Sequence, residues 1–188
     1  MATGPKLDRN DPPDWLIYNV VRWLPLVERW HSDFPELDPA WVLAVIAQES
    51  QGFPKIEGTD GANSIGLMQV IPRSWTGTRR QLEDPAFNLY VGMRMLSATL
   101  RQTEGNLRRA LAAYNCGFES LDAGRCRADG GYAYADRVLG YWTPVFRAEI
   151  FRWANEDWIS AGRKRTAGWL ATLGYVEGLG KWDDAERE

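Results

Sequence analysis

The sequence predicts a mainly α-helical protein with a small region of loops and short strands. Three segments begin with favoured N-cap residues, Asp38, Asp84 and Asn106, and continue with apolar residues at helical spacing. Asp and Asn accept hydrogen bonds from the free N–H groups of a first helical turn, and the prolines after Asp38 and Asp84 fit the first helical position. Residues 53–78 are instead punctuated by glycines and lack a helical period, which favours turns and a β-hairpin.

The chain begins with a polar segment, residues 1–13, whose prolines favour a flexible tail. The following segment, residues 14–31, carries an apolar stripe at helical spacing, made of Leu16, Val20, Trp23, Val27 and Trp30. Pro25 lies within this stripe and lacks a backbone N–H, so it should kink or split the helix.

The next helix is expected to be buried on all sides. It opens at Asp38, and its run from Trp41 to Ala47 contains no polar side chain. Gly52 is a natural terminator, so Glu49 falls on the last turn. Burial and the negative end of the helix dipole both raise the pKa of a carboxyl there, which suits a general acid. The alternative is a glutamate that faces water.

Further along, two helices are expected at residues 85–104 and 107–116, each followed by a glycine. Residues 121–131 form a loop. A helix with Tyr134, Val138 and Tyr141 on one face should follow, kinked or ended at Pro144.

A length of 188 residues fits one compact domain. We assign it to residues 14–146 and interpret residues 147–188 as a helical extension packed on the same domain. No apolar run is long enough to span a bilayer, and the net charge of −3 does not favour nucleic acid as a partner. One histidine and two cysteines exclude an ordinary zinc site, and no metal or other cofactor is expected.

Three short motifs together resemble a known enzyme family. Glu49-Ser50, Gly66-Leu67-Met68-Gln69 and Ala113-Tyr114-Asn115 resemble, in order and spacing, the soluble (SLT-type) lytic transglycosylases, which share the lysozyme fold. The resemblance covers roughly residues 37–141. It implies an α+β lysozyme-like fold with a buried central helix and a cleft beside the hairpin region.

The resemblance also implies an activity, cleavage of the MurNAc–GlcNAc β-1,4 bond of peptidoglycan. In this family the N-acetyl group assists departure of the leaving group. The muramyl 6-hydroxyl then attacks the same carbon, giving a 1,6-anhydromuramyl product. Glu49 would act first as acid and then as base, a dual role that needs a pKa near ambient pH.

Six other residues are expected at the substrate by the same resemblance, namely Ser50, Met68, Gln69, Tyr114, Asn115 and Tyr134. Gln69 would hydrogen-bond sugar hydroxyls or the acetamide, and Met68 would line the cleft. Tyr114 and Asn115 would contact Glu49 or the sugar. For Met68 and Tyr114, simple apolar packing is the alternative.

Two of these six have more than one implied role. Tyr134 would hydrogen-bond the acetamide or the acid, and Ser50 would orient the local backbone or contact substrate. Trp75 is the best candidate among the ten tryptophans for stacking on a sugar, although most tryptophans belong to the core.

One segment departs from the family pattern, because the stretch between Glu49 and Gly66 is slightly longer than usual. Thr59, Asp60 or Ser64 would fill the role of a family serine. Asp60 as a second carboxylate would instead give a hydrolytic muramidase of the goose-type lysozyme kind. A non-catalytic wall-binding or virion protein that keeps the fold is a further alternative.

The expected partner is the peptidoglycan glycan strand, and we expect a monomer that acts in the cell envelope, the periplasm or outside the cell. The first residues lack a hydrophobic signal core, which suggests a removed leader, holin-dependent release or carriage on a phage particle. Cys116 and Cys126 lie close in sequence, and they either pair in an oxidising environment or remain reduced.

Overall fold

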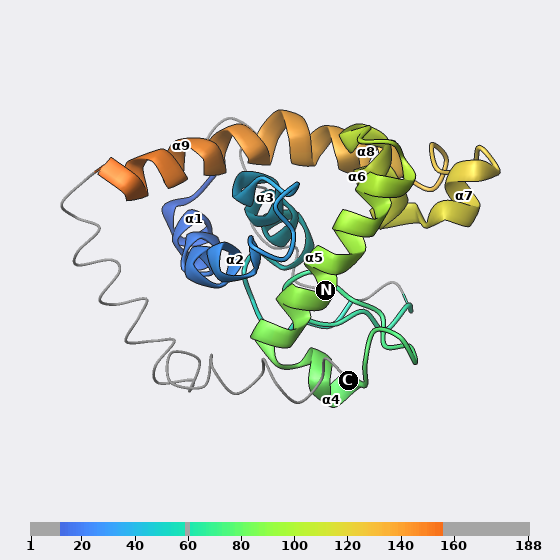
Figure 1. Ribbon diagram of the computed structural model, residues 1–188, viewed down its shortest axis with the longest axis horizontal. Helices are drawn as coiled ribbons and strands as arrows, with labels where there is room; N and C mark the ends of the chain where they lie inside the picture. Colours follow the sequence, from blue (N-terminus) through green and yellow to red (C-terminus); the bar gives the residue numbers. More distant parts are fainter. Residues whose placement is uncertain (1–11, 59–60, 156–188) are drawn as a thin grey trace. The chain divides into compact units, whose positions relative to one another are not determined.

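The computed structural model describes residues 12–58 and 61–155, which are mainly helical, as expected (Figure 1). The helices are α1 (Asp14–Val21), α2 (Leu24–Trp30), α3 (Pro39–Ser50), α4 (Arg79–Leu82), α5 (Pro85–Gln102), α6 (Leu107–Cys116), α7 (Phe118–Asp122), α8 (Gly131–Arg137), the π-helix η1 (Val138–Trp142) and α9 (Thr143–Asn155).

The chain divides into two units at Ala148 and Glu149. Only the first seven residues of the second unit, 149–155, are described, and the candidate site below belongs to the first unit. The expected tail and the expected C-terminal extension therefore lie almost entirely outside the described residues. Among the described residues, no helix combines the length and apolar character that a bilayer span needs.

Helix α3 forms the centre of the first unit, as its apolar run predicts. Every residue from Val42 to Ala47 is buried, and α3 packs against α1, α2 and η1. The Asp38 carboxylate accepts a hydrogen bond from the backbone N–H of Ala40 over 2.8 Å, which confirms it as the N-cap. Helix α3, which carries Glu49 near its carboxyl end, is thus surrounded by other helices of the unit (Figure 1).

The carboxyl end of α3 is held by the N-terminal helices. Gln51, rather than Gly52, takes the left-handed C-cap conformation, with φ of 53°. Asn19 donates to the Gln51 carbonyl over 2.5 Å, while Trp23 and Arg22 donate to the Gly52 carbonyl over 3.0 and 3.2 Å. A Cβ at Gly52 would overlap the Asn19 backbone, so this close approach requires glycine.

The split predicted at Pro25 is confirmed. The first helical segment ends at Val21, and the second begins at Leu24, which places Pro25 in the first turn of α2. A first-turn residue has no helical acceptor for its N–H, so proline is tolerated there.

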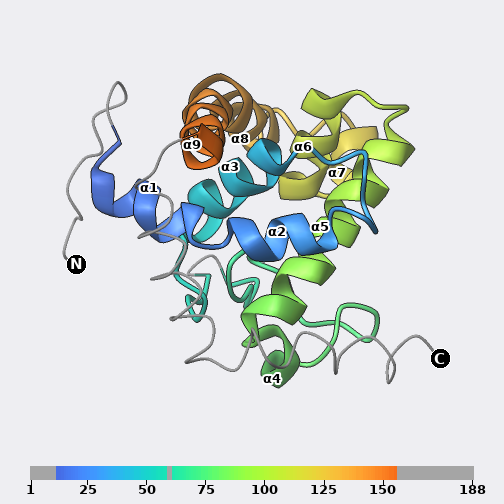
Figure 2. The ribbon, with the colours of Figure 1, turned by 60° about the vertical axis from the view of Figure 1, so that its left-hand side comes forward.

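The two other predicted N-caps are also confirmed. The Asp84 side chain accepts from the Phe87 N–H over 2.9 Å, and the Asn106 side chain accepts from the Arg109 N–H over 3.1 Å. Helix α5 runs from α4 at one end to α6 at the other, as Figures 1 and 2 show. It therefore connects the loop region to the helix that carries Tyr114 and Asn115.

Between α3 and α4, the expected strands are reduced to isolated bridges. Three antiparallel bridges occur among the described residues of this region, Glu57 with Ile65, Ile65 with Val70, and Arg73 with Gly77. Positive φ angles at Gly66 and Gln69 fold residues 66–69 into a tight turn instead of a strand. Alternation of side chains cannot continue through such a turn.

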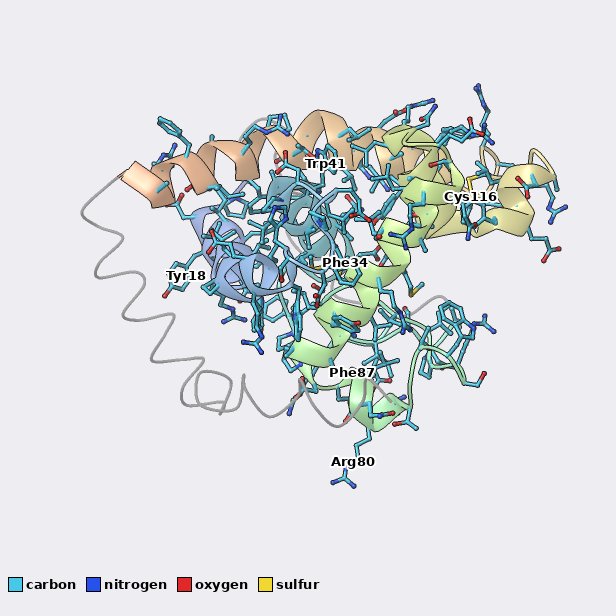
Figure 3. All side chains as sticks on the ribbon, viewed as in Figure 1. Tyr18, Phe34, Trp41, Arg80, Phe87 and Cys116 are labelled. Atoms are coloured by element: carbon cyan, nitrogen blue, oxygen red, sulfur yellow. A yellow bond between two sulfur atoms is a disulfide. The ribbon has the colours of Figure 1, made fainter. Side chains whose placement is uncertain are left out.

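After α6, the structure contains a short helix, α7, that was not expected. Cys116 and Cys126 form a disulfide with Cα atoms 5.6 Å apart, so the pair is oxidised and closes the loop around α7. The bond is visible beside Cys116 in Figure 3.

Pro144 does not end its helix, which was one of the two outcomes expected there. Residues 131–155 remain helical throughout, and Pro144 is the second residue of α9. The π-turn η1 comes directly before it, where the Val138 carbonyl accepts from both the N–H and the hydroxyl of Thr143. The wider turn accommodates a residue that lacks an N–H.

Candidate active site

A cavity of about 140 Å³ opens beside the end of α3. Its described lining residues come from α3, α5, α6 and the segment 62–76, and they are Glu49, Ala62, Ser64, Gln69, Ile71, Arg73, Trp75, Thr76, Met95, Tyr114 and Asn115. Pockets that enclose a whole small ligand usually measure about 300–1,000 Å³. This cavity is therefore suited to holding one part of a longer chain.

Glu49 lies on the last turn of α3, where the sequence predicted it, and is half-buried. Of the described lining residues, it alone carries a carboxyl. The helix places it opposite Tyr114 and Asn115, which belong to the last turn of α6. Residues 65 positions apart in the chain thus face one cavity.

Ser50 is buried and does not line the cavity. Its hydroxyl donates to the Leu67 carbonyl over 2.8 Å and accepts from the Gly52 N–H over 3.2 Å. These contacts join the end of α3 to the 66–69 turn, so the side chain orients local backbone.

Gln69 lines the cavity and is held on both sides of its amide. Its nitrogen donates to the carbonyls of Ile56 and Gly66 over 3.1 and 3.0 Å, and its oxygen accepts from the Ser64 hydroxyl over 2.9 Å. Both amide protons are used, and one lone pair of the oxygen remains for a ligand. The side chain is therefore fixed before any ligand arrives.

The Met68 side chain is fully buried and does not line the cavity, contrary to expectation. It packs against Gly92 of α5, where an added Cβ would overlap its sulfur. The Met68 carbonyl accepts a hydrogen bond from the Tyr114 hydroxyl over 2.8 Å. Within the 66–69 turn, Met68 thus contacts α5 through its side chain and α6 through its backbone carbonyl.

Asn88 of α5 organises this turn, although it belongs to none of the three sequence motifs. Its amide nitrogen donates to the Ile65 and Leu82 carbonyls over 2.7 and 3.0 Å, and its oxygen accepts from the Met68 N–H over 2.9 Å. The residue is completely buried. The available signal was an amide side chain between apolar neighbours on a helix expected to be core.

Two tyrosines complete the surroundings of Glu49. Burial, the larger cause, and the charge of Glu49 raise the pKa of Tyr134 well above its usual value, and the pKa of Tyr114 rises for the same two reasons. Hydrogen bonding with Glu49 adds to the rise in the pKa of the buried Tyr134 hydroxyl, which therefore lies beside the carboxyl. Both hydroxyls therefore remain protonated beside the carboxyl.

Of the other residues predicted at the site, three line the cavity and two lie outside the described residues. Asn115 is exposed and lines the cavity, as does the exposed Trp75. Among the three candidates for the family serine, Ser64 lines the cavity and bonds to Gln69, whereas Thr59 and Asp60 lie outside the described residues.

Glu57, Asp122 and Asp136 do not supply a second carboxylate to the cavity. Glu57 forms an ion pair with Arg79, and Asp136 forms one with Arg108 at 2.6 Å, a contact that lowers the pKa of Asp136. Neither residue lines the cavity, nor does Asp122. Within residues 12–58 and 61–155, no cluster of three side chains is arranged to hold a metal ion.

Comparison with known proteins gives a consistent family assignment. Residues 29–130 match the family model described as the transglycosylase SLT domain. Over 93 residues the chain is 32% identical to the soluble lytic murein transglycosylase of Escherichia coli (strain K12), covering 44% of this chain and 14% of that protein. It is 34% identical over 93 residues to the transglycosylase of Enterobacteria phage PRD1, covering 47% and 32% respectively. The chain thus spans less than a third of the length of either relative.

Two solved structures share the fold. The crystal structure of the 70-kDa soluble lytic transglycosylase from Escherichia coli matches with a TM-score of 0.56 and 24% identity, over 65% of this chain and 24% of that one. The complex of the 70-kDa soluble lytic transglycosylase with bulgecin A matches with a TM-score of 0.59 and 25% identity, over 69% and 25%. The expected lysozyme-like helical fold is confirmed.

Proposed function

The chain belongs to the family of transglycosylase SLT domains, and from this premise we propose that it is a lytic transglycosylase of peptidoglycan. It would cleave the MurNAc–GlcNAc β-1,4 bond and form a 1,6-anhydromuramyl end, with Glu49 as the single acid and base. The observation that carries this proposal is the position of Glu49, the only carboxyl among the described residues that line the cavity.

The proposed reaction has two steps on one carbon. Glu49 gives its proton to the bridging oxygen while the acetamide oxygen of the muramyl sugar bonds to the anomeric carbon and the glycosidic bond breaks. The ionised Glu49 then takes the proton of the 6-hydroxyl, whose oxygen displaces the acetamide oxygen. No water is consumed, and Glu49 ends protonated as it began, so one carboxyl is sufficient.

The neighbours of Glu49 suit supporting roles in this reaction. Asn115 has an amide at the cavity surface that is able to orient the acetamide or a sugar hydroxyl. Gln69 offers one remaining lone pair of its amide oxygen to a sugar hydroxyl. The raised pKa of Tyr134 keeps its hydroxyl protonated, so it is able to donate to Glu49 or to the acetamide.

The test is cleavage of purified cell walls by the wild type and by Glu49→Gln, with products identified by mass. We expect the wild type to release anhydro products, which are lighter by one water than hydrolysed ones. Because the amide cannot give up a proton as an acid does, Glu49→Gln should lose at least about 100-fold in rate. Its thermal unfolding should stay close to that of the wild type, since the amide has nearly the same shape.

Each other outcome has a defined meaning. Reducing-end products would favour the hydrolytic muramidase, with Asp60 as the first residue to test as its second carboxylate. Equal cleavage by wild type and Glu49→Gln would remove Glu49 from the reaction. No cleavage by either, with binding retained, would favour a wall-binding or virion protein.

The proposed place of action is the cell envelope or the space outside it, where the substrate lies. The Cys116–Cys126 disulfide supports this, because disulfides persist mainly in oxidising compartments. The relatives include a protein of a bacterium and one of a phage. The proposed place of action is compatible with a cellular protein and with one delivered by a phage.

A further inference from the structure

We propose that Arg73 and Trp75 form a subsite that recognises a muramyl residue through its ring face and a carboxylate that it carries. The inference rests on the proposed function, since it names which residues of this chain would distinguish the muramyl sugar from its neighbour in the strand. Both side chains line the same cavity as Glu49 and are exposed, so a strand bound across the acid would pass over them.

The turn that carries the two residues is built around a buried threonine. The Thr76 hydroxyl donates to the Ile71 carbonyl over 2.7 Å and accepts from the Arg73 N–H over 2.7 Å. The N–H of Gly77 also donates to the Arg73 carbonyl over 3.0 Å, which closes the turn. The backbone of residues 71–77 is thus tied at several points, and its exposed side chains project from a defined base.

Helix α5 holds this turn through two side chains, Arg94 and Phe87. An Arg94 guanidinium nitrogen donates to the Trp75 carbonyl over 2.6 Å. The ring of Phe87, labelled in Figure 3, lies against Gly77, where an added Cβ would come within 2.8 Å of a ring carbon. The turn is therefore fixed to the same helix that holds the 66–69 turn through Asn88.

Trp75 is unusual among the described tryptophans. Its residue is 58% exposed, whereas Trp23 is 0% exposed and Trp142 is 4% exposed. Trp15, also exposed, at least pairs with the ring of Phe53. Leaving a large aromatic ring in water forgoes the gain of burying it, so a ring face next to a cavity is an available surface for an apolar ligand face. The C–H face of a pyranose ring is such a surface.

Arg73 supplies the charge. Six other arginines, Arg79, Arg101, Arg108, Arg125, Arg147 and Arg152, form ion pairs with carboxylates, whereas Arg73 forms none with any residue the structure describes. A guanidinium binds a carboxylate through two parallel hydrogen bonds. Arg73 also has few competitors nearby, because Glu49 is the only carboxyl among the described lining residues.

The chemistry of the strand identifies the matching sugar. A muramyl residue carries a lactyl group, which ends in a free carboxylate or continues into a peptide that has carboxylates of its own. An N-acetylglucosamine residue offers the same kind of ring face without any carboxylate. Trp75 should therefore contribute to binding of either sugar, whereas Arg73 should favour only the muramyl residue.

The experiment measures dissociation constants in the Glu49→Gln background, so that bound strands are not cut. Three soluble ligands of equal length are compared: a neutral chito-oligosaccharide, a muramyl-containing strand with free lactyl groups, and the same strand with its peptides. Arg73→Gln should weaken binding of at least one carboxylated ligand roughly threefold to tenfold and leave the chito-oligosaccharide unchanged. Trp75→Ala should weaken all three by a similar factor.

Two matched controls are available. Arg80→Gln removes an exposed arginine that does not line the cavity, and Tyr18→Ala removes an exposed aromatic ring on α1; both residues are labelled in Figure 3. Neither should change any dissociation constant. Thermal unfolding of all four variants shows that losses do not come from misfolding.

The ligands also separate the two sources of the carboxylate. A loss confined to the strand with free lactyl groups assigns Arg73 to the lactyl carboxylate, and a loss confined to the peptide-bearing strand assigns it to the peptide. Equal losses for all three ligands, or no loss, with Arg73→Gln would overturn the inference. Cleavage of walls by Glu49→Gln is scored separately, and its persistence would overturn the proposed function instead.

Discussion

The side chains around Glu49 come from distant parts of the chain, and the charge of Glu49 changes the pKa values of the tyrosines beside it. Tyr134 comes from α8, yet Glu49 contributes to the rise of its pKa. Glu49, Gln69, Tyr114 and Asn115 were all expected at the site from sequence, and all four line the cavity. Ser50 and Met68 do not line the cavity; Ser50 orients the local backbone and Met68 packs against α5, which was one of the two roles expected for each. A motif names neighbours in sequence, but side-chain direction depends on tertiary packing.

The first prediction at this scale concerns turnover. We expect Asn115→Ala and Tyr134→Phe each to lower kcat about tenfold or more while changing wall binding little, because their proposed contacts strengthen as the sugar reacts. Steady-state kinetics on soluble muramyl strands, with binding measured in the Glu49→Gln background, separates the two effects. A change confined to affinity would assign both residues to uniform binding of the strand.

A second prediction at this scale concerns alkaline pH. Tyr134 is buried, and burial, followed by the Glu49 charge, raises its pKa above that of an unfolded tyrosine, about 10. The fold therefore favours the protonated hydroxyl. This contribution is fully present below pH about 10 and is lost as the pH rises toward the folded pKa, because the unfolded chain then binds fewer protons.

Denaturant unfolding of the wild type and of Tyr134→Phe between pH 8 and about 11 measures this effect. The wild type should lose stability more steeply above pH about 10, by up to about 1.4 kcal/mol per pH unit for one group. Parallel curves for the two proteins would mean that Tyr134 ionises as easily in the fold as in the unfolded chain.

At the scale of elements, the starts of three helices could be predicted from the sequence, whereas the turn at residues 66–69 could not. Asp38, Asp84 and Asn106 act locally, through a side chain and an N–H two or three residues ahead, so their signal survives without tertiary structure. The turn depends on Asn88, more than twenty residues from the carbonyl of Ile65 that it holds. Long-range contacts of this kind leave only a weak mark in one sequence.

The prediction at this scale is that Asn88→Ala destabilises the protein by about 1–3 kcal/mol, because buried partners of Ile65, Leu82 and Met68 are left without hydrogen bonds. It should also lower kcat, since the turn that carries Gln69 loses its anchor. Asn106→Ala is the control, as loss of that cap costs about 1 kcal/mol at the end of α6 opposite to Tyr114 and Asn115, and Asn106 does not line the cavity. If both variants keep wild-type kcat at a temperature where they are folded, Asn88 acts on stability alone.

At the scale of the whole molecule, the described residues form a helical domain of the transglycosylase SLT family with a single disulfide among them. The cysteine spacing left the pair undecided, because proximity in sequence does not fix proximity in space. The fold brings Cys116, at the end of α6, beside Cys126. The bond follows Asn115 directly, so it restrains the helix end that borders the cavity.

We predict that reduction lowers the melting temperature by roughly 5–10 °C, since a loop this short accounts for about 2–3 kcal/mol. Thiol titration of the native protein, before and after reduction, provides the measurement, with calorimetry on both forms. A Cys116→Ser, Cys126→Ser double variant should melt like the reduced protein and be insensitive to reductant. Free thiols in the unreduced native protein would contradict an oxidised state and an extracytoplasmic place of action.

The hydrogen bonds from α1 and the α1–α2 junction to the end of α3 have a practical consequence for the design of a shortened version of this domain. The family match starts at residue 29, but Asn19, Arg22 and Trp23 hold the backbone of Gln51 and Gly52, two and three residues after Glu49. A fragment that begins at residue 29 would keep every motif residue. It would lose Asn19, Arg22 and Trp23, and with them the hydrogen bonds that hold the carboxyl end of α3. The working unit for domain swaps, fusions or directed evolution should therefore begin no later than Asp14.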